Sequence, residues 1–385
     1  MKIIYCIHSV YNPGGMERVL LNKVQWLSEN TDWEIKIVTT DQHGRPPFYK
    51  FPGKVLFTDL GINYSEDNIL SPLGKISGYL KKKRLHKKRL KEYLSEEMAD
   101  IVVSLFPSES SFIPDIKDGS RKVLELHFNR NFRLQYGRTG IIGMTDRLRT
   151  ISDYRLAKRF HDFVVLTEED RRNWGDLRNI TVIPNAVHTI PDRVSDLNSK
   201  RVIAVGRLDY QKGFDKLIDA WALTMRKHPE LKGWRLDIFG QGEWHEMLLN
   251  KIADQNLADS VAINKPTDNI TEEYLKSSLL VMSSNYEGFG MVLVEAMACG
   301  VPCVSFACQC GPRDIIEPGV NGLLVRTGDA EMLADAMARV MSDDTLRKRM
   351  GNEARRVTDR FSESVVMQQW MALFENVQCE KSSLL

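Results

Sequence analysis

The chain has 385 residues, of which 43% are hydrophobic and 27% charged. These values are ordinary for a globular protein, and the length suits two domains of typical size. No apolar run reaches the roughly 20 residues that a membrane-spanning helix needs. The start of the chain lacks a signal-peptide cleavage site, and the six cysteines lack the spacing of a disulfide scaffold. These features favour a cytoplasmic location.

Positive charge gathers in the first half of the chain. Residues 1–190 hold 30 Lys and Arg against 23 Asp and Glu, a net charge of +7, whereas the remainder carries a net charge of −5. A basic half indicates an anionic partner, such as a membrane surface, a phosphorylated lipid or a nucleic acid.

Strand-like and helix-like patterns alternate along the chain, which predicts parallel sheets with helices on both faces. In the first half the expected strands are 3–7, 33–39, 55–58, 101–105, 122–126, 163–166 and 180–183. In the second half they are 201–205, 235–239, 261–263, 279–282, 303–306 and 322–325, with helices at about 214–227, 243–255 and 291–299. Beyond Val325 we expect only helices, with Asp329 and Ser362 as N-caps.

A polar stretch from Asn185 to Lys200 is typical of a linker between domains. We therefore predict one Rossmann-like domain at 1–190 and a second at 196–360, with a last helix at about 361–380 that packs back on the first. The fold class is α/β, with two doubly wound domains facing each other across a cleft. Ligands of such sheets bind beyond the carboxyl ends of the strands, so functional motifs are expected there.

The strongest motif covers residues 283–300, directly after the expected strand 279–282. A glycine-bearing loop leads into a helix, whose first N–H groups are a natural seat for phosphate. The loop and helix also carry Glu287 and Glu295, and carboxylates accept hydrogen bonds well from sugar and ribose hydroxyls. The alternative is structural: Glu287 caps a turn and Glu295 is a solvated helix residue.

This sequence resembles the glycosyltransferases of family 4, which are retaining enzymes with the two-domain GT-B fold. The resemblance covers nearly the whole chain and is densest from Val202 to Val325. It implies that Glu287 binds the donor sugar and that Glu295 binds the ribose hydroxyls of a nucleotide sugar. It also implies a donor-binding loop made of Phe289, Gly290, Met291 and Val292.

A second motif, at residues 205–214, places Gly206 at a strand end and Arg207 and Lys212 on the two sides of a loop. An arginine fork and a lysine point charge are the expected counterions of a diphosphate. The resemblance implies that Gly206, Arg207 and Lys212 grip the donor pyrophosphate and help the leaving group to depart. The alternative is two surface cations on a loop. Because a positive pair can replace a metal electrostatically, and no aspartate-rich motif is present, we expect no metal and no cofactor.

Two candidates lie in the first half. Gly14 and Gly15 follow the first strand, where glycine lets the backbone approach a ligand closely. The resemblance implies a glycine loop over the donor phosphate and beside the acceptor, and Gly15 is the preferred residue. His127 follows another strand end, and the resemblance implies a position near the donor sugar. A structural histidine is the alternative.

Two clusters invite other interpretations. Four cysteines fall within residues 299–310 and invite zinc, but their apolar neighbours favour buried free thiols. The basic run at 75–91 could form an amphipathic helix on an anionic membrane or a solvated helix face, and the sequence favours neither. Its apolar face would comprise Leu73, Ile76, Leu80, Leu85, Leu90 and Leu94.

The sequence therefore predicts a metal-independent, retaining hexosyltransferase. The expected donor is a nucleoside-diphosphate sugar, with UDP as the expected nucleotide. The expected acceptor is a glycan or a lipid-linked acceptor in cell-surface polysaccharide or glycolipid synthesis, at the inner face of the membrane. Two rivals are a sugar-nucleotide epimerase of the same architecture and a non-catalytic nucleotide-sugar-binding subunit. No motif supports nucleic-acid binding.

Overall fold

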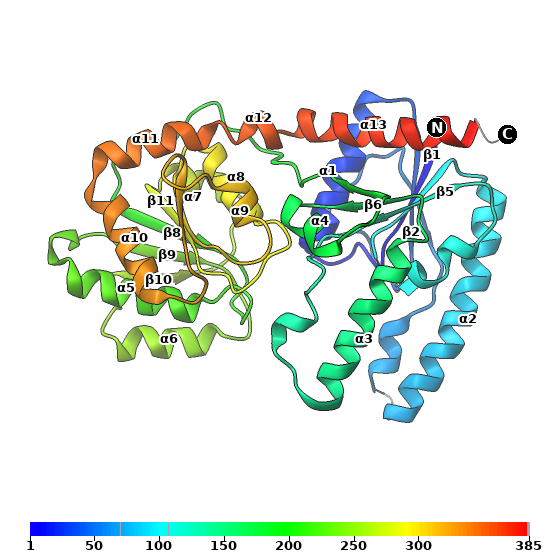
Figure 1. Ribbon diagram of the computed structural model, residues 1–385, viewed down its shortest axis with the longest axis horizontal. Coiled ribbons are helices and arrows are strands. Elements are labelled where there is room, and N and C mark those ends of the chain that lie inside the picture. The colour runs from blue at the N-terminus through cyan, green and yellow to red at the C-terminus, as the bar shows by residue number, and fades with distance from the viewer. Residues whose placement is uncertain (70, 107, 383–385) are drawn as a thin grey trace. The chain divides into compact units, whose positions relative to one another are not determined.

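The computed structural model describes residues 1–69, 71–106 and 108–382 of the chain (Figure 1). The chain forms two compact units. The first comprises Met1–Val165, Trp174–Ile183 and the chain from Met367 onward, and the second comprises Leu166–Asn173 and Pro184–Val366. Each unit is built on one sheet, and every strand pair recorded in either sheet is parallel.

The first unit holds a seven-stranded sheet in the order β3-β2-β1-β4-β5-β6-β7. Its strands are β1 (Lys2–Cys6), β2 (Glu34–Thr39), β3 (Leu56–Asp59), β4 (Ile101–Ser104), β5 (Arg121–Glu125), β6 (Asp162–Val165) and β7 (Ile180–Val182). Its helices are α1 (Gly15–Asn30), α2 (Pro72–Glu97), α3 (Gly140–Ala157) and most of α13 (Glu363–Ser382), and α4 (Glu168–Trp174) lies at the division between the units.

The second unit holds a six-stranded sheet in the order β10-β9-β8-β11-β12-β13. Its strands are β8 (Arg201–Val205), β9 (Arg235–Phe239), β10 (Val261–Asn264), β11 (Leu279–Met282), β12 (Cys303–Phe306) and β13 (Gly322–Val325). Its helices are α5 (Phe214–Lys227), α6 (His245–Asp254), α7 (Ile270–Leu275), α8 (Met291–Ala298), α9 (Pro312–Ile315), α10 (Ala330–Ser342), α11 (Asp344–Arg355) and α12 (Thr358–Phe361).

The second sheet is buried on both faces. Val202 and Ala204 of β8 belong to one apolar cluster, and Ile203 between them belongs to another. Successive side chains of a strand point to opposite faces, so the two clusters lie on the two sides of the sheet. Burial on both sides explains why these strands are continuous apolar runs rather than alternating ones.

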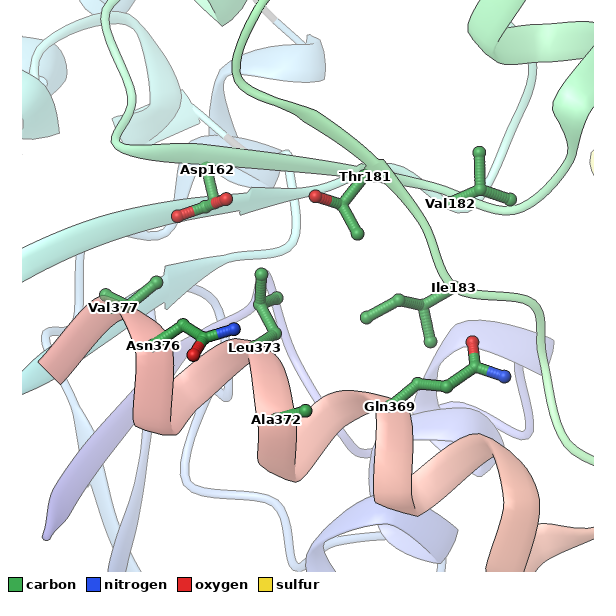
Figure 2. A pocket seen from close by; sticks show the side chains of 9 residues that line it. All are labelled: Asp162, Thr181, Val182, Ile183, Gln369, Ala372, Leu373, Asn376 and Val377. Carbon is green, nitrogen blue, oxygen red and sulfur yellow. The ribbon is translucent and has the colours of Figure 1, made fainter. Parts of the chain in front are cut away.

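The last helix, α13, begins in the second unit and continues in the first, to which its residues from Met367 onward belong. Trp370 and Phe374 of this helix are buried, and Phe374 packs edge-on against Trp33. A hollow of about 450 Å³ lies where α13 meets β6 and β7, and Figure 2 shows Gln369, Leu373 and Asn376 among the side chains that line it.

The cysteines at 299–310 are buried free thiols. Burial raises the pKa of Cys299 to about 12 and raises those of Cys303, Cys308 and Cys310 further. Within the described ranges, no group of three or more His, Cys, Asp or Glu side chains is placed to hold a metal ion.

The basic run lies on α2, but its predicted apolar face is wrong as a single surface. Leu90 and Leu94 are fully buried in the core of the first unit, whereas Ile76, Leu80 and Leu85 are exposed. The C-terminal half of the helix therefore packs into the core, whereas the N-terminal half contacts the segment Tyr64–Ile69 through Tyr79 and Lys82. The side chain of Leu73 lies outside the described residues. Over the ranges that the structure covers, no helix is both long and apolar enough to cross a bilayer.

Candidate functional site

The loops that follow β8 and β11 meet at one edge of the second sheet, because these strands are neighbours in the sheet. Hydrogen bonds join the two loops. Asn285 N donates to Gln211 O (2.8 Å), Gln211 Nε2 donates to Tyr286 O (3.2 Å), and Ser283 Oγ donates to Lys212 O (2.9 Å). The two motifs that the sequence predicts separately thus form one structure.

Lys212 and Glu287 contact each other at the centre of this structure. Lys212 Nζ donates to Glu287 Oε1 at 2.6 Å, and Ser284 Oγ donates to the same oxygen at 2.6 Å. The lysine side chain is 15% exposed and the glutamate side chain 7%. Gly206 leaves room for the lysine stem, since an added Cβ there would lie 3.0 Å from its methylene groups.

Gly213 sets the turn between this loop and α5. Its φ is +61°, and an added Cβ would lie 2.4 Å from Ser283 O. Both the left-handed backbone and the close approach of the neighbouring loop require glycine here.

Arg207 lies beside this contact but does not take part in it. Its Nη2 donates to Gln211 Oε1 (2.7 Å) and lies 3.1 Å from Asp209 Oδ2. The side chain is 69% exposed, so the guanidinium remains in water at the rim of the two loops.

Glu295 lies one helix away, on α8. Tyr274 OH, buried on α7, donates to Glu295 Oε2 at 3.0 Å. Burial, reinforced by this carboxylate, raises the pKa of Tyr274 well above its usual value, so the tyrosine stays a donor and fixes the direction of Glu295.

The donor-binding loop predicted from the sequence ends at the start of α8. Gly290 is the N-cap in a left-handed conformation with no side-chain cap. Leu293 N donates back to Gly290 O at 2.9 Å, whereas the N–H groups of Met291 and Val292 precede the first i to i−4 hydrogen bond of the helix. The Phe289 side chain is buried and packs edge-on against Phe361. Only the backbone of Phe289 is therefore available to a ligand.

Gly15 and His127 belong to the first unit. Gly15 is the first residue of α1, and an added Cβ would meet no atom within 4 Å. Nothing in the folded unit requires glycine at this position.

His127 Nε2 lies 3.1 Å from Glu125 Oε1, and the buried Lys23 Nζ donates to the same oxygen. Burial would raise the pKa of Glu125, but Lys23 and His127 outweigh it and lower this pKa to about 2. Glu125 is therefore ionised, and the imidazole lies beside this carboxylate. The ammonium of Lys23 also lies 3.4 Å from the centre of the Trp370 ring.

Sequence reasoning missed Glu125 and Lys23. A charged residue at the end of an apolar strand was a signal for Glu125. No sequence pattern marks Lys23 as a buried residue, because its burial depends on the packing of α1 and α13.

Three comparisons with known proteins bear on the fold and on the class of protein. Residues 189–357, less than half of the chain, match the family model described as glycosyl transferases group 1. An uncharacterized glycosyltransferase from Haemophilus influenzae is 27% identical over 97% of this chain and 99% of its own length. An exopolysaccharide phosphotransferase from Streptomyces coelicolor is 38% identical over 55% of this chain, which spans only 23% of that protein.

Among solved structures, a TarM mutant from S. aureus in complex with Fondaparinux, alpha-GlcNAc-glycerol and UDP superposes with a TM-score of 0.75. The match covers 97% of this chain and 99% of that one at 19% identity. The fold is GT-B, as the sequence predicts. Within it, residues 189–357 are the part similar to the glycosyl transferases of group 1.

Proposed function

We propose that this protein is a retaining, metal-independent hexosyltransferase that uses a nucleoside-diphosphate sugar, with UDP as the nucleotide. The observation that carries the proposal is the contact between Lys212 and Glu287 on two joined loops at the carboxyl edge of the second sheet. A cation and a carboxylate held together there suit a diphosphate and the hydroxyls of the sugar attached to it.

The residues would act mainly by charge and position. Lys212 and Arg207 stabilise the negative charge that develops on the leaving diphosphate, and the N–H groups of Met291 and Val292 add to this stabilisation. Glu287 holds the donor sugar, and Glu295 holds the ribose. In front-face attack the leaving diphosphate itself accepts the acceptor proton, so the protein supplies orientation rather than a strong base.

The proposal also includes His127 and Gly15 of the first unit, as residues that contact the substrates. Glu125 would orient the imidazole of His127, in the way that a buried carboxylate orients a catalytic histidine. The absence of any steric need for glycine at residue 15 supports a close approach of a ligand to this backbone.

The comparisons support the broader setting. The S. aureus structure contains UDP, and the Streptomyces relative bears the name of an exopolysaccharide phosphotransferase. We therefore place this protein in cell-surface polysaccharide or glycolipid synthesis, in the cytoplasm at the inner face of the membrane, with a glycan or lipid-linked acceptor.

A thermal-shift screen with UDP-, GDP- and ADP-sugars tests the donor, because a ligand that binds the folded state raises the unfolding temperature. We expect the largest shift with UDP-sugars, unchanged by EDTA. NMR of the product should then show the anomeric configuration of the donor; inversion, or a requirement for added metal, would contradict the mechanism.

The two rivals have separate tests. An epimerase converts the donor alone, so incubation of a UDP-sugar without acceptor should yield no epimer. A non-catalytic subunit would bind the donor yet transfer it to no member of a broad panel of glycan and lipid acceptors.

Membrane contact through residues 75–91 is part of the proposal, and the exposed apolar residues of α2 support it. A longer stripe lies on α3, where Ile141, Met144, Leu148 and Ile151 recur at helical spacing and are all exposed, Ile141 by 78%. The exposed charged residues of this helix, Arg147, Arg149 and Arg155, are all positive. Apolar side chains with cationic neighbours suit an anionic bilayer.

A further inference from the structure

Two guanidinium groups of the first unit lie over tyrosine rings. Arg18 Cζ, on α1, is 4.6 Å from the centre of the Tyr49 ring, and Arg45 Cζ is 4.7 Å from the centre of the Tyr11 ring. Both arginines are exposed. In the portion of the chain that the structure describes, no Asp or Glu oxygen lies within 4.0 Å of either guanidinium.

The two loops that carry these arginine–tyrosine contacts are joined by hydrogen bonds. Tyr11 belongs to the loop that follows β1, and Arg45 and Tyr49 belong to the loop that follows β2, which is the neighbouring strand. Phe48 N donates to Val10 O at 2.8 Å, which joins the two loops. Gln42 binds both: its Oε1 accepts from Val10 N (3.0 Å) and its Nε2 donates to Arg45 O (2.8 Å). The cations are thus held in place before any ligand arrives.

An aromatic hollow of about 430 Å³ adjoins the stacks, lined by residues that include Phe48, Tyr49, Lys50, Phe51 and Phe57. Phe48 is 56% exposed, and the rings of Phe51 and Phe57 meet edge-on at 5.1 Å. Exposed ring faces of this kind pack against the C–H groups of sugar rings and polyol chains.

The charge of the loop that follows β2 has one sign. Residues 42–57 carry Arg45, Lys50 and Lys54, and no Asp or Glu. Asp41, just before them, is buried and accepts a hydrogen bond from Ser65 N at 2.9 Å. A guanidinium stacked on an aromatic ring keeps its N–H edge free, and that edge fits the oxygens of an anion bidentately.

We propose that this surface, defined as Tyr11, Arg18, Arg45, Phe48, Tyr49 and Lys50 and called here the acceptor platform, binds the acceptor of the reaction, and that the acceptor is a polyanionic glycan or polyol chain. The platform lies at the carboxyl edge of the first sheet, on the loop and helix that flank Gly15. The inference rests on the proposed transferase function and names its acceptor class. Phosphodiester and carboxylate chains share the chemistry that the platform recognises.

The test measures binding of fluorescent oligomers of matched length: poly(glycerol phosphate), oligogalacturonate and neutral dextran. We expect the full-length protein to bind at least one anionic oligomer and not dextran, and the preferred oligomer identifies the anion. Arg18→Ala and Arg45→Ala should each weaken this binding about ten-fold. Lys in place of either arginine should recover only part of it, because the charge remains but the planar fork is lost.

The matched control removes two exposed arginines elsewhere in the same unit, with Arg147→Ala and Arg149→Ala combined. If this control weakens binding as much as the platform variants, or if dextran binds equally, the platform is not the acceptor site. Stabilisation by UDP, measured on the same variants, should not change. Loss of the UDP effect in wild type would refute the proposed function, whereas intact UDP binding with no oligomer binding would refute only the platform.

Discussion

Lys212 Nζ lies 2.6 Å from Glu287 Oε1, although 75 residues separate the two in the chain. The pair is largely buried, so its attraction is screened less by water than that of a surface pair. In the proposed mechanism, a bound donor shares this ammonium between the carboxylate and its diphosphate. The site therefore holds its cation in position before the reaction begins, which is the condition for efficient electrostatic stabilisation.

Replacing Lys212 with Ala should reduce transfer and donor hydrolysis together. The variant loses the cation that faces the leaving group, and we expect kcat to fall by about a hundred-fold or more. Single-turnover assays with a UDP-sugar would measure both reactions.

The matched control is Lys216→Ala, four residues further along on α5. Lys216 Nζ donates to Asn285 Oδ1 in the neighbouring loop, so this variant removes an equal charge and a bond between the same loops without touching Glu287. Equal losses of activity in both variants would mean that Lys212 acts only by holding the loops together.

Much of the fold was predictable because parallel buried strands are short apolar runs with clear ends. The predicted strands 201–205, 235–239 and 279–282 coincide with β8, β9 and β11. Once the order of parallel strands is known, the motifs at their carboxyl ends must lie at the same edge of the sheet. What sequence could not predict is pairing between distant segments: Leu166–Asn173 belongs to the second unit, and no local pattern marks that change.

The same limit applies to side chains. Glu125, Lys23 and His127 come together only because β5 and α1 pack side against side, and α13 covers Lys23 through Trp370. Likewise, the apolar residues of α2 all look alike in sequence, yet Leu90 is buried and Ile76 is not. Helical spacing identifies a face, but packing decides what covers it.

Alanine substitutions at Gly213 and Gly15 should have different effects: the first should lower stability and the second should lower activity. Gly213→Ala brings a Cβ within 2.4 Å of Ser283 O at a positive φ, and should destabilise the protein by about 1–3 kcal/mol. Gly15→Ala meets no atom within 4 Å and should leave stability unchanged while lowering donor turnover. Urea unfolding and a transfer assay on both variants measure the two effects. Full activity of Gly15→Ala would remove this residue from the donor site.

The buried pair of Glu125 and Lys23 should make the free energy of unfolding depend on pH in the acid range. The pKa of Glu125 is lowered from 4.5 to about 2, so its contribution is complete above pH 4.5 and is lost as pH falls toward 2. Glu125→Gln leaves Lys23 buried without its anion and should cost about 3–5 kcal/mol at pH 7. The double variant with Lys23→Met should cost less than Glu125→Gln alone and lose the acid dependence in this window. A simple sum of the two single effects would show that the pair is not coupled.

The raised pKa of Glu109 should give the stability of the protein a pH dependence opposite to that from Glu125. It lies in the short 3₁₀ helix Ser108–Ser111, where burial raises its pKa from 4.5 to about 7 despite a hydrogen bond from Ser104 Oγ. The folded state therefore holds this proton between pH 4.5 and 7 while the unfolded state releases it, and stability falls as pH rises through that window. Glu109→Gln should stabilise the protein by about 3 kcal/mol at pH 7.5 and by little at pH 4. Urea unfolding at both pH values would measure this, and equal effects at the two would contradict the assignment.

The stripe on α3 should contribute to membrane binding. Ile141→Ser and Leu148→Ser remove exposed apolar side chains that make no core contact, so folding should be unaffected. On vesicles that contain phosphatidylglycerol, each change should lower the partition coefficient about ten-fold in sedimentation assays, because an apolar side chain no longer leaves water. Met332→Ser, at an exposed apolar position on α10, serves as the control. Neutralising Lys81 to Arg84 on α2 should reduce binding further and weaken its dependence on salt. Equal binding to neutral vesicles, or no change in any variant, would show that the bilayer does not cover this surface.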